Sequence, residues 1–252
     1  MLFPSPSTPL LWHILAFLLI VVGPLLSYFY ERPLLRAISS SRQKIGFYGY
    51  VLAVEWSVAA LAAGIAGPAS LFFPPLPHGQ GLPAWSRILI GVLLAAFFLL
   101  ALMPFLQSLR GEKYRAAYAR AYQRSLDEVS RVLPATHQER LWFAAVSLTA
   151  GVCEELLCRG FLFRYLDGIA LHLPLPATLS VAAAIFGLNH IYQGKIAILK
   201  TGVAGLAFGA LFLVTGNLLI PMLLHAAIDL QMVFVLRPAK PQLDQPIPTP
   251  SS

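Results

Sequence analysis

Six ionisable side chains stand inside apolar stretches in the second half of the sequence: Glu154, Glu155, Arg159, His190, His225 and Asp229. Such a side chain in hydrocarbon costs about 2.5–3.5 kcal/mol on insertion scales, so each one needs a partner or a function. A buried carboxylate beside two imidazoles can act as a general base that takes a proton from water. The residue types therefore predict hydrolysis by an activated water molecule.

Helical spacing separates two neighbouring glutamates. Glu155 and Arg159 are four residues apart, so they lie on one helix face and can form an ion pair. Glu154 points about 100° away from Glu155, and we expect it to face the histidines of other helices. His225 and Asp229 are also four residues apart, so this carboxylate could orient the imidazole.

Structural explanations stay open for several of these residues. The pair of Glu155 and Arg159 is interpreted as structural, because an internal ion pair satisfies both charges. A single intramembrane histidine is often a hydrogen-bond partner between helices, but two histidines with an additional glutamate favour a functional site. Asn189 is a possible assistant to that site. Glu55 has no evident partner, and we interpret it as a packing residue or an adaptation to the lipid interface.

The composition predicts a membrane protein. Of 252 residues, 58% are hydrophobic and 12% are charged, and the mean hydropathy is +0.71. Soluble domains carry about 25% charged residues. The net charge of +7 is concentrated in clusters between apolar stretches, which is typical of membrane topology and argues against nucleic-acid binding. The two cysteines, Cys153 and Cys158, have neither zinc-type spacing nor a shared helix face.

Seven apolar stretches approach the length of about 20 residues that a membrane-spanning helix needs. They are residues 10–30, 46–72, 87–106, 141–162, 176–192, 196–215 and 217–236. The sequence thus predicts an all-α, polytopic bundle of about seven transmembrane helices. Gly205 and Gly209 form a GxxxG pattern, which predicts a close contact between two helices.

Connections that contain lysine or arginine alternate along the chain with connections that contain neither. The connections 74–86, 166–176 and 215–217 contain neither residue, whereas those after the first, third, fifth and seventh spans are basic. This pattern predicts an N-terminus outside and a C-terminus in the cytoplasm. The short loops favour a bacterial inner membrane.

The depths of Glu154 and His190 constrain the helices. Counted from the predicted span ends at about 1.5 Å per residue, the two depths differ by about 11 Å in an upright bundle. The residues can meet only if their helices are steep or broken, or if the predicted bounds are wrong by several residues.

One membrane domain is expected, in three parts. Residues 1–136 contain three spans and a basic segment, 107–134, interpreted as an amphipathic helix on the cytoplasmic surface, with a packed cytoplasmic helix as the alternative. Thr136 and Glu139 predict a capping box at the start of the fourth span. Residues 137–237 hold four spans, and the Pro-rich tail, 238–252, is expected to be disordered.

Three motifs carry a family resemblance. Residues 154–159 match EExxxR, residues 186–190 match FxxxH, and residues 225–229 match HxxxN/D. In this order, each within an apolar span, they resemble the CPBP family (CAAX protease and bacteriocin-processing, or Abi) of glutamate-dependent intramembrane endopeptidases, which is related to the type II CAAX prenyl endopeptidases. The resemblance covers about 137–237.

The resemblance implies a role for each residue. Glu154 and His190 would activate water, and His225 and Asp229 would stabilise or orient the oxyanion site. The supporting residues would be Glu155, Arg159, Phe186 and Asn189. Asp229 stands where eukaryotic CAAX proteases usually carry asparagine, and an ionised aspartate cannot donate a hydrogen bond to an oxyanion.

The resemblance also implies substrates and cofactors. The expected substrates are membrane-associated or lipidated proteins or peptides within the bilayer. The alternative is a non-proteolytic immunity or maturation protein, or a small transporter that uses the carboxylates as a proton relay. No cofactor is expected. A zinc ion held by His190, His225 and Glu154 is the alternative, although the sequence has no HExxH.

Overall fold

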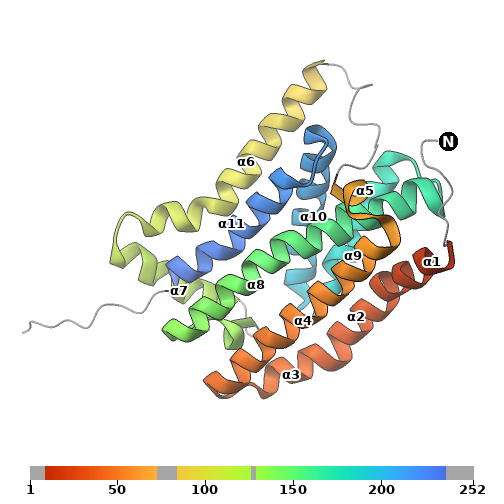
Figure 1. Ribbon diagram of the computed structural model, residues 1–252. Helices are drawn as coiled ribbons and strands as arrows, with labels where there is room; N and C mark the ends of the chain where they lie inside the picture. Colours follow the sequence, from red (N-terminus) through yellow and green to blue (C-terminus); the bar gives the residue numbers. More distant parts are fainter. Residues whose placement is uncertain (1–8, 73–83, 126–128, 237–252) are drawn as a thin grey trace, which may run out of the picture.

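The computed structural model describes residues 9–72, 84–125 and 129–236, and in these segments all regular structure is helical (Figure 1). The all-α prediction is therefore confirmed. Five helical segments are long and apolar enough to cross a membrane: Pro9–Ala37, Ser41–Ala66, Trp85–Ser108, His137–Ile169 and Lys195–Thr215. Two shorter apolar helices, Leu175–Asn189 and Leu219–Val235, correspond to the other two predicted spans. The tail predicted to be disordered lies outside the described residues.

The first span is one long helical segment with irregular turns. It comprises α1 (Pro9–Phe17), α2 (Gly23–Leu26) and α3 (Arg32–Ala37), joined by the π-helical turns Leu18–Val22 and Ser27–Glu31. π-helical turns are rare in proteins, and those that occur are often found at functional sites.

The second predicted span is interrupted near its end. α4 (Ser41–Ala66) stops before Gly67, and the short α5 (Pro68–Phe72) follows. Gly67 has φ +78°, a conformation that glycine adopts without a Cβ penalty, and Pro68 has no N–H with which to continue the α4 ladder. The predicted span 46–72 is thus two helices.

The polar segment 107–134, predicted to be one amphipathic helix, contains a shorter helix. α7 (Glu112–Ser125) follows α6 (Ala84–Ser108), and Tyr118 packs near Leu133 and Met232. The capping box at the start of α8 (His137–Glu155) is confirmed, since Thr136 accepts from the Glu139 amide and the Glu139 carboxylate accepts from the Thr136 amide.

α8 lies at the centre of the bundle, between α4 and α11 (Leu219–Val235) (Figure 1). The approach of α11 to α8 requires Gly151, because a Cβ atom there would lie 2.8 Å from the Ala226 Cβ. This close packing brings the end of α8 next to the middle of α11.

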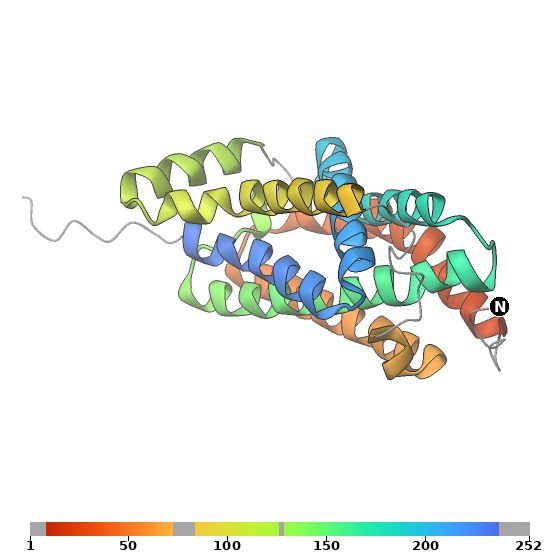
Figure 2. The same ribbon diagram turned by 90° about the horizontal axis from the view of Figure 1, so that it is seen from above.

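α9 (Leu175–Asn189) packs along α10 (Lys195–Thr215). The predicted GxxxG contact is confirmed, because a Cβ on Gly205 would lie 3.1 Å from the Ala183 Cα. Viewed from above, α10 crosses α6 and α8 (Figure 2).

The short α9 explains how Glu154 and His190 can meet. The predicted span 176–192 ends at Asn189, so α9 is 15 residues long, or about 22 Å, against an apolar core of about 30 Å. α8 continues through the π-helical turns Leu156–Leu162 and Tyr165–Ile169. The two side chains therefore meet where α8 becomes π-helical and α9 ends, with His190 Nε2 3.8 Å from Glu154 Oε2, which agrees with broken helices, one of the predicted solutions.

Candidate active site

His190 caps the C-terminal end of α9 and has φ −96° and ψ 17°. Its Nδ1 lies 2.8 Å from the Phe186 carbonyl oxygen. A carbonyl only accepts, so Nδ1 carries the hydrogen and, in the neutral ring, Nε2 keeps a lone pair. Nε2 lies 3.8 Å from Glu154 Oε2. The backbone of α9 therefore fixes an acceptor nitrogen beside the carboxylate.

Glu154 stands near the end of α8, just before the π-helical turn Leu156–Leu162. Its Oε2 lies 3.8 Å from His190 Nε2 and 3.8 Å from His225 Nε2. This oxygen is buried and has no hydrogen-bond partner among the described residues. Separations of 3.8 Å are too long for direct hydrogen bonds, and such polar groups around a space can hold a water molecule.

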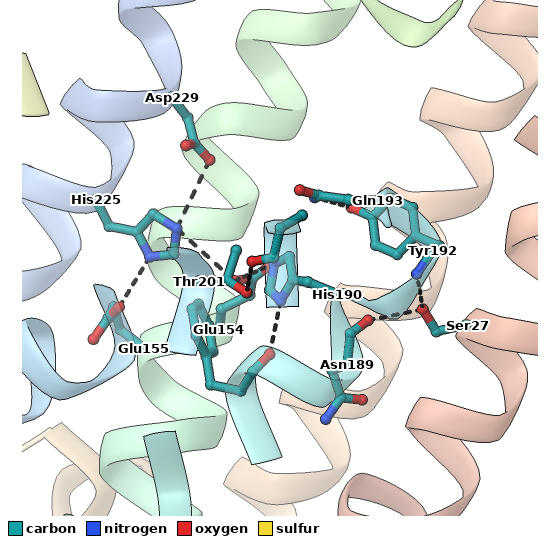
Figure 3. Close-up of polar contacts among 12 residues, drawn as sticks. Ser27, Glu154, Glu155, Asn189, His190, Tyr192, Gln193, Thr201, His225 and Asp229 are labelled. Carbon is teal, nitrogen blue, oxygen red and sulfur yellow. Dashed lines mark hydrogen bonds and ion pairs between the residues drawn. The ribbon is translucent and has the colours of Figure 1, made fainter. Parts of the chain in front are cut away.

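His225 lies between Glu155 and Asp229 in Figure 3. Its Nδ1 is 2.9 Å from Glu155 Oε1, and its Nε2 is 3.7 Å from Asp229 Oδ2. The ring also stacks on Phe208, with the centroids 4.9 Å apart. The spacing predicts that Asp229 could orient this imidazole, but the short contact is made by Glu155, and Asp229 faces the other nitrogen beyond hydrogen-bond distance.

Arg159 and Glu155 form the predicted ion pair, with Arg159 Nη1 2.9 Å from Glu155 Oε1. The second amino group of Arg159 donates to the Gly205 carbonyl at 2.9 Å, and its guanidinium lies 4.8 Å from the Phe186 ring centroid. Both charged side chains are buried, with Glu155 at 0% and Arg159 at 2% exposure. The same Glu155 oxygen contacts Arg159 and His225, so the pair also positions the imidazole.

Asn189 anchors the turn that carries His190. Its Nδ2 donates to the carbonyls of Leu19 and Ile185, at 3.1 and 2.9 Å. Ser27 Oγ donates to the Asn189 carbonyl at 2.9 Å and accepts from the Tyr192 amide at 3.3 Å. Asn189 thus ties the end of α9 to the first helical segment.

Sequence reasoning missed Ser27. It is buried at 1% exposure, but a serine in an apolar stretch shows no spacing that would distinguish this anchor. The contact of Glu155 with His225 was also missed, because it joins residues 70 positions apart.

Two cavities meet at these residues. The first, of about 330 Å³, is lined mainly by aliphatic side chains of the first helical segment, α4, the continuation of α8, and α9. The second, of about 370 Å³, extends towards α10 and α11 and includes His225, Asp229 and Thr201. Glu154, His190 and Glu55 line both. The sequence favours a packing or lipid-interface role for Glu55, and the structure places it at the cavities instead.

A carboxylate with a buried oxygen between two imidazoles, at the junction of two cavities in an apolar helix bundle, indicates a functional site rather than a packing role. Residues 136–231 match the model of the type II CAAX prenyl endopeptidase Rce1-like family. The predicted family resemblance is therefore confirmed over a region that includes Glu154, His190, His225 and Asp229. Comparisons with curated proteins and with solved structures found no match.

Proposed function

We propose that this protein is a glutamate-dependent intramembrane endopeptidase that hydrolyses peptide bonds of membrane-associated or lipidated substrates. The observation that carries the proposal is the position of Glu154 Oε2, buried and 3.8 Å from the Nε2 atoms of both His190 and His225. The match to a family of CAAX endopeptidases supports the same reaction class.

Glu154 and His190 are suited to activate water. A water molecule between them would donate one hydrogen to the carboxylate and the other to the free Nε2 of His190, whose tautomer is fixed by the Phe186 carbonyl. Its oxygen lone pair is then left for attack on the peptide carbonyl carbon. Glu154 takes the proton as the bond to carbon forms.

His225 is suited to stabilise the oxyanion. Three carboxylates surround its ring, and Glu155 Oε1 accepts from Nδ1, so Nε2 faces Glu154 and Asp229. With hydrogens on both nitrogens, the ring would donate from Nε2 to the oxyanion of the tetrahedral intermediate, which would form in the space next to Glu154. Asp229 Oδ2, 3.7 Å from His225 Nε2, would add a negative charge that stabilises the protonated ring. If Asp229 is itself protonated, it would donate a hydrogen bond to the oxyanion.

The cavities favour a lipidated substrate. Aliphatic residues such as Leu18, Val22 and Val58 line the first cavity and suit an apolar chain. The second cavity offers Gln193, Thr201 and other polar groups that suit a peptide. The scissile bond would then lie where both cavities meet, beside Glu154. The basic connections favour a cytoplasmic C-terminus.

A cleavage assay tests this proposal. The purified protein in liposomes is given an internally quenched peptide that ends in a farnesylated Cys-aliphatic-aliphatic-Xaa sequence, and the same peptide without the lipid. We expect cleavage of the lipidated peptide and a higher KM for the unmodified one, because the first cavity would stay empty. Absence of cleavage of either peptide by folded protein, together with unchanged termini of membrane proteins in cells with and without it, would contradict the proposal.

Removal of metal ions is expected to leave the activity intact. Glu154 and His190 can polarise water without a metal, since both are acceptors. The measurement is cleavage after dialysis against a strong zinc chelator, with the metal content of the same sample. One zinc per chain, with activity lost on chelation and restored by zinc, would instead assign His190 and His225 as ligands.

Asp229→Asn is expected to retain most of the activity, whereas Asp229→Ala loses most of it. Asparagine keeps an oxygen beside His225 and adds a permanent donor, while alanine removes both. If protonated Asp229 donates to the oxyanion, Asp229→Asn also removes an alkaline decline from the pH–rate profile; loss of such a donor typically costs about 100- to 1000-fold. An alanine variant as active as wild type would show that Asp229 only packs.

A further inference from the structure

Glu55 brings a second buried carboxyl group to the active-site cavities from outside the region that matches the family. It lies on α4 and lines both cavities together with Glu154 and His190. α4 is held in register against α8 at the next residue, where Trp56 Nε1 donates to Thr149 Oγ1 at 3.0 Å. The position of Glu55 in the cavity wall is therefore fixed.

The surroundings of Glu55 differ from those of Glu154. Its Oε2 is buried and has no hydrogen-bond partner among the described residues. Glu55 shares the lining of both cavities with Glu154, and that of the second cavity with His225 and Asp229. The Nε2 atoms of His190 and His225 each lie 3.8 Å from Glu154 Oε2, whereas Glu55 forms no ion pair with a histidine among the described residues.

Two neighbouring carboxyl groups in a cavity of low polarity do not both ionise. Both groups have a buried Oε2 without a hydrogen-bond partner among the described residues, but the two imidazoles 3.8 Å from Glu154 Oε2 favour the negative charge on Glu154. Glu55 therefore carries the proton when Glu154 is the base. A protonated carboxyl is a donor, and this one faces the space in which the peptide would be cut.

We propose that Glu55 is the general acid of the reaction, the group that protonates the departing amine. This inference rests on the proposed endopeptidase function. Water adds its oxygen to the carbonyl carbon, and its proton goes to Glu154. The C–N bond then breaks, and its nitrogen takes the proton of Glu55. A proton passes from Glu154 to Glu55 afterwards, so one water is consumed and both carboxyl groups return to their starting state.

An ester substrate separates this role from a structural one. An alcohol leaves with much less need for a proton than an amine, so cleavage of a depsipeptide with an ester at the scissile position should depend on Glu55 only weakly. The probes are the farnesylated peptide and its ester analogue. The amide-to-ester rate ratio of one preparation does not depend on how much of the protein is folded.

For Glu55→Gln, we expect the kcat for the amide to fall about 100-fold or more, while the KM stays within about threefold and the ester rate within about fivefold. Glu55→Asp, which keeps an acid, should recover part of the amide rate. Glu154→Gln should abolish cleavage of both the amide and the ester, because both reactions need the activated water. Glu112→Gln, at an exposed position on α7 that lines neither cavity, is the control and should leave the ratio unchanged.

Two results would overturn this inference and leave the proposed function intact: amide cleavage at the wild-type rate in Glu55→Gln, or an equal loss of amide and ester cleavage. If wild-type protein cleaves neither probe, the proposed function itself fails and takes this inference with it.

Discussion

Glu154→Gln is expected to abolish peptide cleavage while the protein still folds. Glutamine has nearly the shape of glutamate, but its amide cannot take the proton of water, and a general base contributes about 100- to 10,000-fold to the rate. The loss of charge is tolerated because Glu154 Oε2 makes no direct hydrogen bond among the described residues. The measurement is cleavage of the farnesylated peptide in liposomes, with the thermal stability of the same sample.

Glu112→Gln is a matched control for this variant. Glu112 lies on α7 with a side chain that is 52% exposed, and its contact with Arg115 is a surface ion pair at 3.6 Å. Such pairs contribute little to stability, so both activity and folding should resemble those of the wild type. Wild-type cleavage by Glu154→Gln would remove Glu154 from the mechanism.

Arg159→Ala is expected to cause the largest loss of folded protein. It leaves Glu155, which has 0% exposure, without its guanidinium partner, and removal of one member of a buried pair costs about 3–5 kcal/mol. It also removes the hydrogen bond to the Gly205 carbonyl on α10. The measurement is the yield of monodisperse protein and its thermal midpoint in detergent.

The double variant with Glu155→Gln tests the pair itself. Neutralising Glu155 should restore part of the stability of Arg159→Ala, because no unpaired buried charge is left. Activity should remain low, since Glu155 Oε1 also holds Nδ1 of His225 at 2.9 Å. A double variant no more stable than Arg159→Ala would show that the two residues are not energetic partners.

Local patterns in the sequence predict the parts of this structure that local physics determines. Long apolar stretches predict helices because backbone groups in lipid must be satisfied within each segment. The capping box of Thr136 and Glu139 and the pair of Glu155 and Arg159 depend on residues three or four apart, so their spacing alone identifies them.

Contacts between distant segments could not be predicted in the same way. The bond from Glu155 to His225 requires that α8 and α11 approach closely at Gly151, which depends on packing rather than on spacing. The end of α9 at Asn189 was missed because Ile191 and Tyr192 continue the apolar pattern. Glu55 stands out in the sequence as a buried charge, but its neighbours in the cavities belong to helices far away in the sequence.

The shortness of α9 and α11 has a consequence for the membrane around the protein. With 15 and 17 residues they measure about 22 and 26 Å, less than the hydrocarbon thickness of about 30 Å. Hydrophobic mismatch of this kind is relieved when the adjacent bilayer thins. Under the proposed function, a thinner bilayer beside these helices would shorten the path of water and of a polar peptide chain from the interface to Glu154, and a lipid-anchored substrate would reach the site from its own leaflet.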